Sequence, residues 1–226
     1  MHIEPGLVDG TKIILSYATA AAAGTVALKA TLSSLGEKGP LSLAVRSLIA
    51  AVGALVFFEV LPHFPVGVSE VHFIFGSTMF LILGAAPSAI GLALGLLLQG
   101  LFLSPTDLPQ YGMNLTTLLV PMFALQLLAG RIIAPGTAYV DLTYKQALTL
   151  STAFQGGVVT WVAFWAIYGG GFGAESLAAV ASFGTIYMAV VLIEPLLDLA
   201  VLAAAKAGHR LLDGSSVVTA RLFRAA

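Results

Sequence analysis

Long apolar runs separated by short polar breaks dominate the chain. A helix needs about 20 mostly apolar residues to cross the hydrocarbon core of a bilayer. The breaks between the runs, such as GEKGP and SPTDLPQYG, are rich in the Gly, Pro and Asp residues that interrupt helices. The pattern predicts about seven transmembrane helices, at residues 11–33, 41–61, 72–85, 87–103, 113–133, 145–168 and 180–205.

The third of these stretches is the shortest. We expect it to form a tight helical hairpin with the fourth, with the turn at Pro87. The sequence carries no internal repeat, coiled-coil heptad or low-complexity tail. It therefore predicts a single transmembrane domain over residues 1–226.

Composition supports this interpretation and excludes several functions. The chain has 226 residues, of which 58% are hydrophobic and 9% charged, whereas soluble proteins average about a quarter charged. It is therefore expected to be an all-α integral membrane protein. It contains no cysteine, so any metal site must use nitrogen or oxygen ligands. A net charge of -1 argues against a nucleic-acid partner, because phosphate binding needs clustered Lys and Arg.

The basic residues predict the orientation in the membrane. The connections at 62–70, 104–111 and 169–175 contain no Lys or Arg. Because cytoplasmic connections carry the excess of positive charge, the C-terminus is predicted to be cytoplasmic and the N-terminus outside. All ten basic residues except Lys12 fall on the cytoplasmic side: Lys29, Lys38, Arg46, Arg131, Lys145, Lys206, Arg210, Arg221 and Arg224.

The first apolar stretch could instead be a cleaved signal peptide. A signal peptide begins with a positively charged segment. Here Glu4, Asp9 and Lys12 sum to -1. We therefore expect the stretch to remain in the protein, with Met1 and His2 on the outer side.

The start of the chain, MHIEPG, has the chemistry of a metal chelate. A free amine at Met1, the amide nitrogen of His2 and the Nδ1 atom of His2 can close two chelate rings around one ion. One further imidazole would complete a planar set of four nitrogens, which suits Ni(II) or Cu(II) and is accessible to Co(II). His63 and His72 lie on the same predicted side as the N-terminus, whereas His209 is expected at the cytoplasmic interface.

Several motifs resemble one family of metal transporters. They are MHI followed by Gly6, the S-x-V-H sequence at residues 69–72 followed by Gly76, and the segments LLLQGLF and YGMNL. Together they resemble the CbiM/NikM family, the substrate-binding membrane subunits of energy-coupling-factor cobalt and nickel transporters. The resemblance is strongest over residues 1–8 and 62–125. It implies that Met1, His2 and His72 hold the transported Co²⁺ or Ni²⁺.

The resemblance also implies partners. The sequence has no G-x-x-x-x-G-K-[ST] motif, so ATP hydrolysis is expected on other subunits and the chain itself is not expected to be an enzyme. The family works in the cytoplasmic membrane with a transmembrane coupling subunit and two ATPase subunits, and a small accessory membrane subunit fits the same scheme. Small residues four positions apart, at 20 and 24 or at 50 and 54, could dock the coupling subunit.

Other polar residues have two interpretations each. His63 could relay metal at the entrance of the site, or belong to a rigid turn between two prolines. Ser69 is a further candidate to line the entrance or support the site. Gln99 and Asn114 could orient an imidazole through their amide groups, and they could equally join helices.

A pair of acids lies inside the last apolar stretch. Glu194 and Asp198 are one helical turn apart, on either side of Pro195. They could contact a partner subunit or pair with Arg131, or lie close enough to the cytoplasmic interface to be hydrated.

Two other functions fit parts of the sequence. A vitamin-binding subunit of the same transporter class could use Trp161, Trp165 and Tyr168 as an aromatic pocket, but this leaves Met1 and His2 unexplained. An intramembrane hydrolase would need a nucleophile or metal motif such as H-E-x-x-H, and none occurs. The choice between cobalt and nickel stays open, because the two ions differ little in ligand preference.

Overall fold

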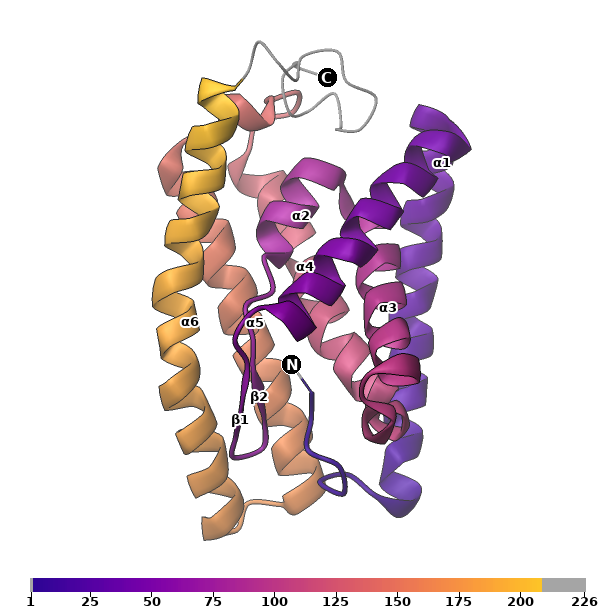
Figure 1. Cartoon of the computed structure of the whole chain (residues 1–226), viewed down its shortest axis with the longest axis vertical. Helices are drawn as coiled ribbons and strands as arrows, with labels where there is room; N and C mark the ends of the chain where they lie inside the picture. The colour runs from indigo at the N-terminus through magenta and orange to yellow at the C-terminus, as the bar shows by residue number, and fades with distance from the viewer. Residues whose placement is uncertain (1, 209–226) are drawn as a thin grey trace.

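The computed structural model describes residues 2–208 and is a bundle of long helices (Figure 1). A short two-stranded hairpin, β1 (Phe64–Val66) and β2 (Ser69–Val71), lies beside the last helix in one half of the bundle. The helices are α1 (Ile14–Leu55), α2 (Gly76–Leu83), α3 (Ala85–Phe102), α4 (Tyr111–Ile132), α5 (Tyr144–Gly170) and α6 (Ala174–Ala207).

Helix α1 consists of two halves. At Gly39 the backbone has φ 76° and ψ 170°, a conformation that glycine adopts without strain, and Pro40 begins the second half. Figure 1 shows the chain turning back on itself at this break. The two halves are the helices predicted at 11–33 and 41–61, and the break lies in the predicted GEKGP connection.

Five helical stretches in the described part of the chain are long and apolar enough to cross a membrane. The first contains both halves of α1, and the others correspond to the predicted helices at 87–103, 113–133, 145–168 and 180–205. The start of α1 and the end of α6 lie at opposite ends of the bundle (Figure 1). The chain is thus a multi-pass membrane protein.

The predicted crossing at 72–85 is wrong. Only eight residues are helical there, in α2, and eight residues extend about 12 Å against a hydrocarbon core of about 30 Å. The preceding residues form the hairpin instead of a helix. The turn into α3 also differs from the prediction, because the break is at Gly84 (φ 92°, ψ 164°) and Pro87 lies in the first turn of α3.

Helix α2 begins inside the bundle, where its first backbone N–H groups need acceptors. The carboxylate of Glu194 on α6 accepts the backbone N–H groups of Ile74 and Phe75, each at 2.8 Å. Gln155 on α5 also donates to Glu194, whose side chain is fully buried. An interrupted helix at membrane depth is tolerated when protein groups satisfy its ends in this way.

Asp198 completes the same junction one turn later. Its two carboxylate oxygens accept the hydroxyl groups of Ser77 and Thr78, both at 2.6 Å. Asp198 and Glu194 therefore hold the start of α2. Among the residues that the structure describes, neither carboxylate forms an ion pair with Arg131. At the other end of α2, the buried Arg46 donates to the carbonyl of Leu83 at 2.6 Å.

The small residues of α1 pack against α3. A Cβ atom added at Gly91 would lie 2.2 Å from the Cβ of Ala50, and one at Gly95 would lie 2.6 Å from that of Ala54. Both alanines are fully buried. This face is therefore used inside the subunit, and the prediction that it could dock a partner is wrong. The face around Gly24 is exposed, with no atom within 4 Å of an added Cβ.

Candidate metal centre

The N-terminal segment lies against β2 of the hairpin and pairs with it through an isolated β-bridge. The hairpin turns at Gly67, which has φ 61°. Ile3 pairs with Ser69 in an antiparallel bridge. The backbone N–H of Glu70 donates to the carbonyl of His2 at 3.0 Å, and that of Glu4 donates to the carbonyl of Val68 at 3.2 Å. Backbone pairing thus places His2 beside the S-x-V-H sequence.

Two side chains also hold the N-terminal segment in place. The hydroxyl of Ser69 donates to the carbonyl of His2 at 2.9 Å, and Asn114 Oδ1 accepts the backbone N–H of Ile3 at 2.8 Å. Both side chains are buried, and within the described residues their hydrogen bonds go to the backbone of residues 2 and 3 and none goes to an imidazole. Gln99 is also buried, but within the described residues no hydrogen bond joins it to a histidine.

Three side chains converge at this junction. His2 Nδ1 lies 2.7 Å from Glu70 Oε2, and His72 Nε2 lies 2.9 Å from the same oxygen. One ligand atom from each of the three residues lies within 4.8 Å of the others. The imidazole rings are nearly perpendicular, at 86°, with centroids 5.0 Å apart. The two histidines are 2% and 1% exposed, so the group is enclosed by protein.

Glu70 is the residue that the sequence prediction missed. Alternate residues of a strand point to the same side, so Glu70 and His72 are expected to share one face. This alternation could have identified Glu70 from the sequence. It applies only if residues 69–72 are extended, whereas the apolar pattern predicted a helix that begins at residue 72. The contact of Glu70 with His2 depends on strand pairing over 68 positions and has no local signature.

The protonation states suit metal binding. Burial lowers the pKa of His2, and it lowers the pKa of His72 to about 2, so both imidazoles are neutral near pH 7. Burial alone would raise the pKa of Glu70, but the hydrogen bonds from the two histidines outweigh it and lower that pKa. Neutral imidazole and ionised carboxylate are the forms that bind metal ions.

Three further side chains border the centre. The ring of His63 stacks on that of His72, with centroids 5.0 Å apart and 13° between the planes. His63 is half-buried and thus lies between His72 and the surface. Asp107 Oδ2 lies 4.0 Å from His2 Nδ1 and adds a second acid beside Glu70. Phe58 closes the inner side, with its ring edge-on to both imidazoles of the centre.

Two of the residues that the sequence analysis discussed as possible metal ligands lie outside the described part of the chain, as do Arg210, Arg221 and Arg224. The two are Met1, the expected source of the amine ligand, and His209. Of the expected ligands, the structure therefore brings His2 and His72 together. His2 presents its Nδ1 atom to this group, which is the ring nitrogen that the chelate requires.

The aromatic residues of α5 pack among themselves. Trp165 is fully buried and lies edge-on to Trp161, with centroids 6.5 Å apart, and Trp161 Nε1 donates to Thr116 Oγ1 at 3.1 Å. They do not line the large cavity described next. The structure therefore adds no support for an aromatic vitamin pocket.

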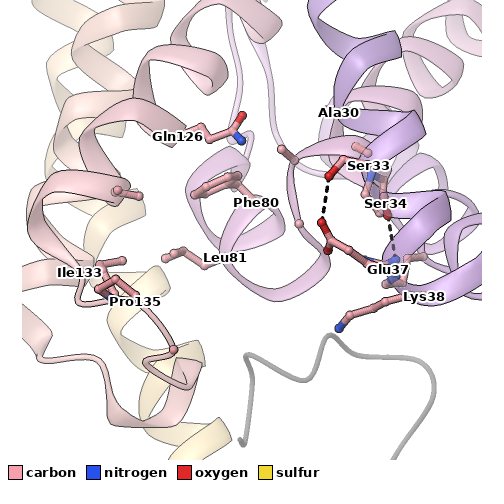
Figure 2. Close-up of a pocket in the computed structure, with 18 of the residues that line it drawn as sticks. Ala30, Ser33, Ser34, Glu37, Lys38, Phe80, Leu81, Gln126, Ile133 and Pro135 are labelled. Carbon is pink, nitrogen blue, oxygen red and sulfur yellow. Dashed lines mark hydrogen bonds between the residues drawn. The ribbon is translucent and has the colours of Figure 1, made fainter. Parts of the chain in front are cut away.

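A cavity of about 580 Å³ lies between α1 and α4, beside the C-terminal end of α2 (Figure 2). Its wall includes the cations Lys38 and Arg46, and the acid Glu37 accepts a hydrogen bond from Ser33 at 2.9 Å. Lys38 and Arg46 would repel a divalent cation. The cavity is thus distinct from the group of His2, Glu70 and His72, which precedes the start of α2.

Comparison with known protein families agrees with the resemblance to metal transporters seen in the sequence. Over residues 2–210 the chain matches CbiM, a family described as the cobalt uptake substrate-specific transmembrane region. No curated protein and no solved structure matches the chain. Because the match covers nearly the whole sequence, the chain belongs to the CbiM family of substrate-specific membrane components of cobalt uptake.

Proposed function

We propose that this protein binds one Co²⁺ or Ni²⁺ ion as the substrate-binding subunit of an energy-coupling-factor transporter. In this proposal residues 1–226 form one domain, with residues 1–8 as its metal-chelating segment. The ion is held by the amine of Met1, the amide nitrogen and Nδ1 of His2, and Nε2 of His72. The observation that carries the proposal is the convergence of His2 Nδ1 and His72 Nε2 on one carboxylate oxygen, at 2.7 and 2.9 Å.

The surroundings of the centre fit the capture of a cation. Asp107 and Glu70 provide negative charge at the partly exposed side, where their side chains are 16% and 28% exposed. His63 covers His72 from the same side and could pass an ion to it. Opposite charge along an access route raises the local concentration of a cation and its rate of binding.

Transport requires partners. The chain carries no nucleotide-binding motif, so the energy would come from two ATPase subunits acting through a transmembrane coupling subunit. The exposed small residues around Gly24 on α1 are a face that this coupling subunit could contact. The family description favours cobalt as the substrate. Four nitrogens alone would favour nickel, which stands above cobalt in the Irving–Williams order.

The test is a titration of the purified subunit, with its native N-terminus, against Co²⁺ and Ni²⁺. His72→Ala is expected to raise the dissociation constant at least about tenfold, because it removes one imidazole ligand. His209→Ala, which alters the histidine predicted on the cytoplasmic side, is the control and should bind as the wild type does. Equal affinity in the wild type and His72→Ala would remove His72 from the site.

A further inference from the structure

We propose that Glu70 is itself a ligand of the transported ion and that it shifts the preference of the site from nickel toward cobalt. This inference rests on the proposed function, because it concerns the ion held by His2 and His72. It changes the site from four nitrogens in one plane to a mixed nitrogen and oxygen set.

The distances place the carboxylate in the coordination sphere. Nitrogen and oxygen ligands lie about 2.0–2.2 Å from a divalent transition metal, so neighbouring ligand atoms are about 3 Å apart. Glu70 Oε2 already lies 2.7 Å from His2 Nδ1 and 2.9 Å from His72 Nε2. One ion can therefore take the place of the two hydrogens in these hydrogen bonds while the oxygen stays almost where it is. Each imidazole then stays neutral by carrying its proton on its other ring nitrogen, His2 Nε2 and His72 Nδ1.

The backbone keeps Glu70 at this place. Its N–H donates to the carbonyl of His2 at 3.0 Å, and the neighbouring Ser69 hydroxyl donates to the same carbonyl at 2.9 Å. Strand β2, which carries Glu70, is thus hydrogen-bonded to His2, which supplies two of the proposed chelating nitrogens. Moving the backbone of Glu70 away from the ion would break the strand pairing that holds His2.

Charge also favours ligation. Imidazole binds a metal ion in its neutral form, and both rings are almost fully buried, so they do not offset the charge of a divalent ion. An uncompensated buried charge is strongly destabilising. Glu70 is the carboxylate that touches both imidazoles, whereas Asp107 Oδ2 is 4.0 Å from His2 Nδ1. The amide nitrogen of His2 loses its proton when it binds the ion and offsets one positive charge, and Glu70 supplies the second negative charge in direct contact with the ion.

A carboxylate changes which ion the site prefers. Ni(II) and Cu(II) are the ions typical of planar sets of nitrogen and oxygen ligands. In our proposal the plane is already occupied by three nitrogens of Met1 and His2 and by His72. Glu70 then adds a fifth ligand outside the plane. The fifth ligand removes the advantage of planar nickel, while Co(II) accepts the higher coordination number.

The experiment compares wild type, Glu70→Gln and Asp107→Asn, all as the full chain with a native N-terminus. The dissociation constants of Co²⁺ and Ni²⁺ are measured by competition. Glu70→Gln is expected to weaken Co²⁺ binding about tenfold and Ni²⁺ binding less, so that the ratio of cobalt to nickel affinity falls. Asp107→Asn removes a nearby charge without removing a ligand and should leave the ratio unchanged. Equal losses of both metals in the two variants would overturn the ligand assignment in favour of a field effect.

The magnetism of the wild-type nickel complex gives a second readout that does not depend on the folding of a variant. A planar nickel site with four nitrogens is diamagnetic, whereas a fifth carboxylate ligand makes it paramagnetic. We expect a paramagnetic complex, and a diamagnetic one would overturn the inference. A wild-type protein that bound neither Co²⁺ nor Ni²⁺ would refute the proposed function itself, which is a different outcome from either result.

Discussion

Asn114, in the first turn of α4, accepts the backbone N–H of Ile3 at 2.8 Å and so joins the N-terminal segment to the helix bundle. Ile3 is fully buried, and the residue before it is His2. The position of the proposed chelate is therefore set by an amide on a helix 111 positions away. Ser69 performs the same task from the hairpin, through the carbonyl of His2.

We predict that Asn114→Leu weakens metal binding without unfolding the bundle. The substitution leaves the buried N–H of Ile3 without an acceptor, which costs about 1–3 kcal/mol. The N-terminal segment can avoid this cost by detaching from the bundle, and His2 then leaves the site. Metal affinity should fall about tenfold, the equivalent of about 1.4 kcal/mol. Thr117→Val is the matched control, because the Thr117 hydroxyl donates to the carbonyl of Met113 in its own helix. Titration with Co²⁺ of both variants checks this, and equal affinity in the two would refute the role of Asn114.

His63→Ala is predicted to change the rate of metal binding more than its equilibrium. The His63 ring lies parallel to that of His72 at 5.0 Å, on its more exposed side. A transient ligand at this place lowers the barrier in both directions. Stopped-flow mixing should show association and dissociation slowed together, each on the order of threefold, with little change in the dissociation constant. Unchanged rates would leave His63 as a turn residue between Pro62 and Pro65, and a large loss of affinity would make it a ligand.

The metal-free protein is predicted to lose stability as the pH falls below about 6.5. Burial lowers the pKa of His72 from 6.5 to about 2 and also lowers that of His2. In this range the unfolded chain binds protons that the folded chain does not, so the unfolded state is favoured as pH falls. Above pH 6.5 both states are neutral and the effect is absent. His72 alone contributes at most about 2 kcal/mol between pH 6.5 and 5.

Melting temperatures at pH 7 and pH 5, measured on metal-free protein in detergent, check this dependence. The wild type should melt at a lower temperature at pH 5. His72→Gln cannot take up the proton and should show a smaller difference between the two pH values. An identical difference in the wild type and the variant would mean that His72 is not buried as a neutral imidazole.

The long helices could be predicted from the sequence, because each is an apolar run bounded by Gly, Pro or polar residues. The short helix α2 could not, since the stretch from Phe73 to Leu83 is largely apolar and would be so whether it crossed the membrane or stayed inside the bundle. The signal that decides between these states is the pair Glu194 and Asp198, whose partners at the start of α2 lie about 120 positions away.

The site was predicted in part for a similar reason. His2 and His72 were identified from motifs, and the structure brings their side chains together. Glu70 was missed because its role follows from the pairing of residues 2–4 with β2, which local patterns do not report. Ala50 and Ala54 were one of two faces predicted as possible contacts for a partner, but spacing alone cannot distinguish a helix of the same chain from a helix of another.

The most direct test of the central claim is the metal content of three forms of the protein after loading with Co²⁺ and desalting. The forms are the untagged chain, a chain extended by Gly-Ser before Met1, and a chain extended by Gly-Ser after Ala226. The N-terminal extension converts the amine to an amide and moves His2 from the second position, which destroys both chelate rings. The untagged and C-terminally extended proteins should retain the ion, and the N-terminally extended protein should lose it. Equal retention by all three forms would mean that the site does not use the free N-terminus.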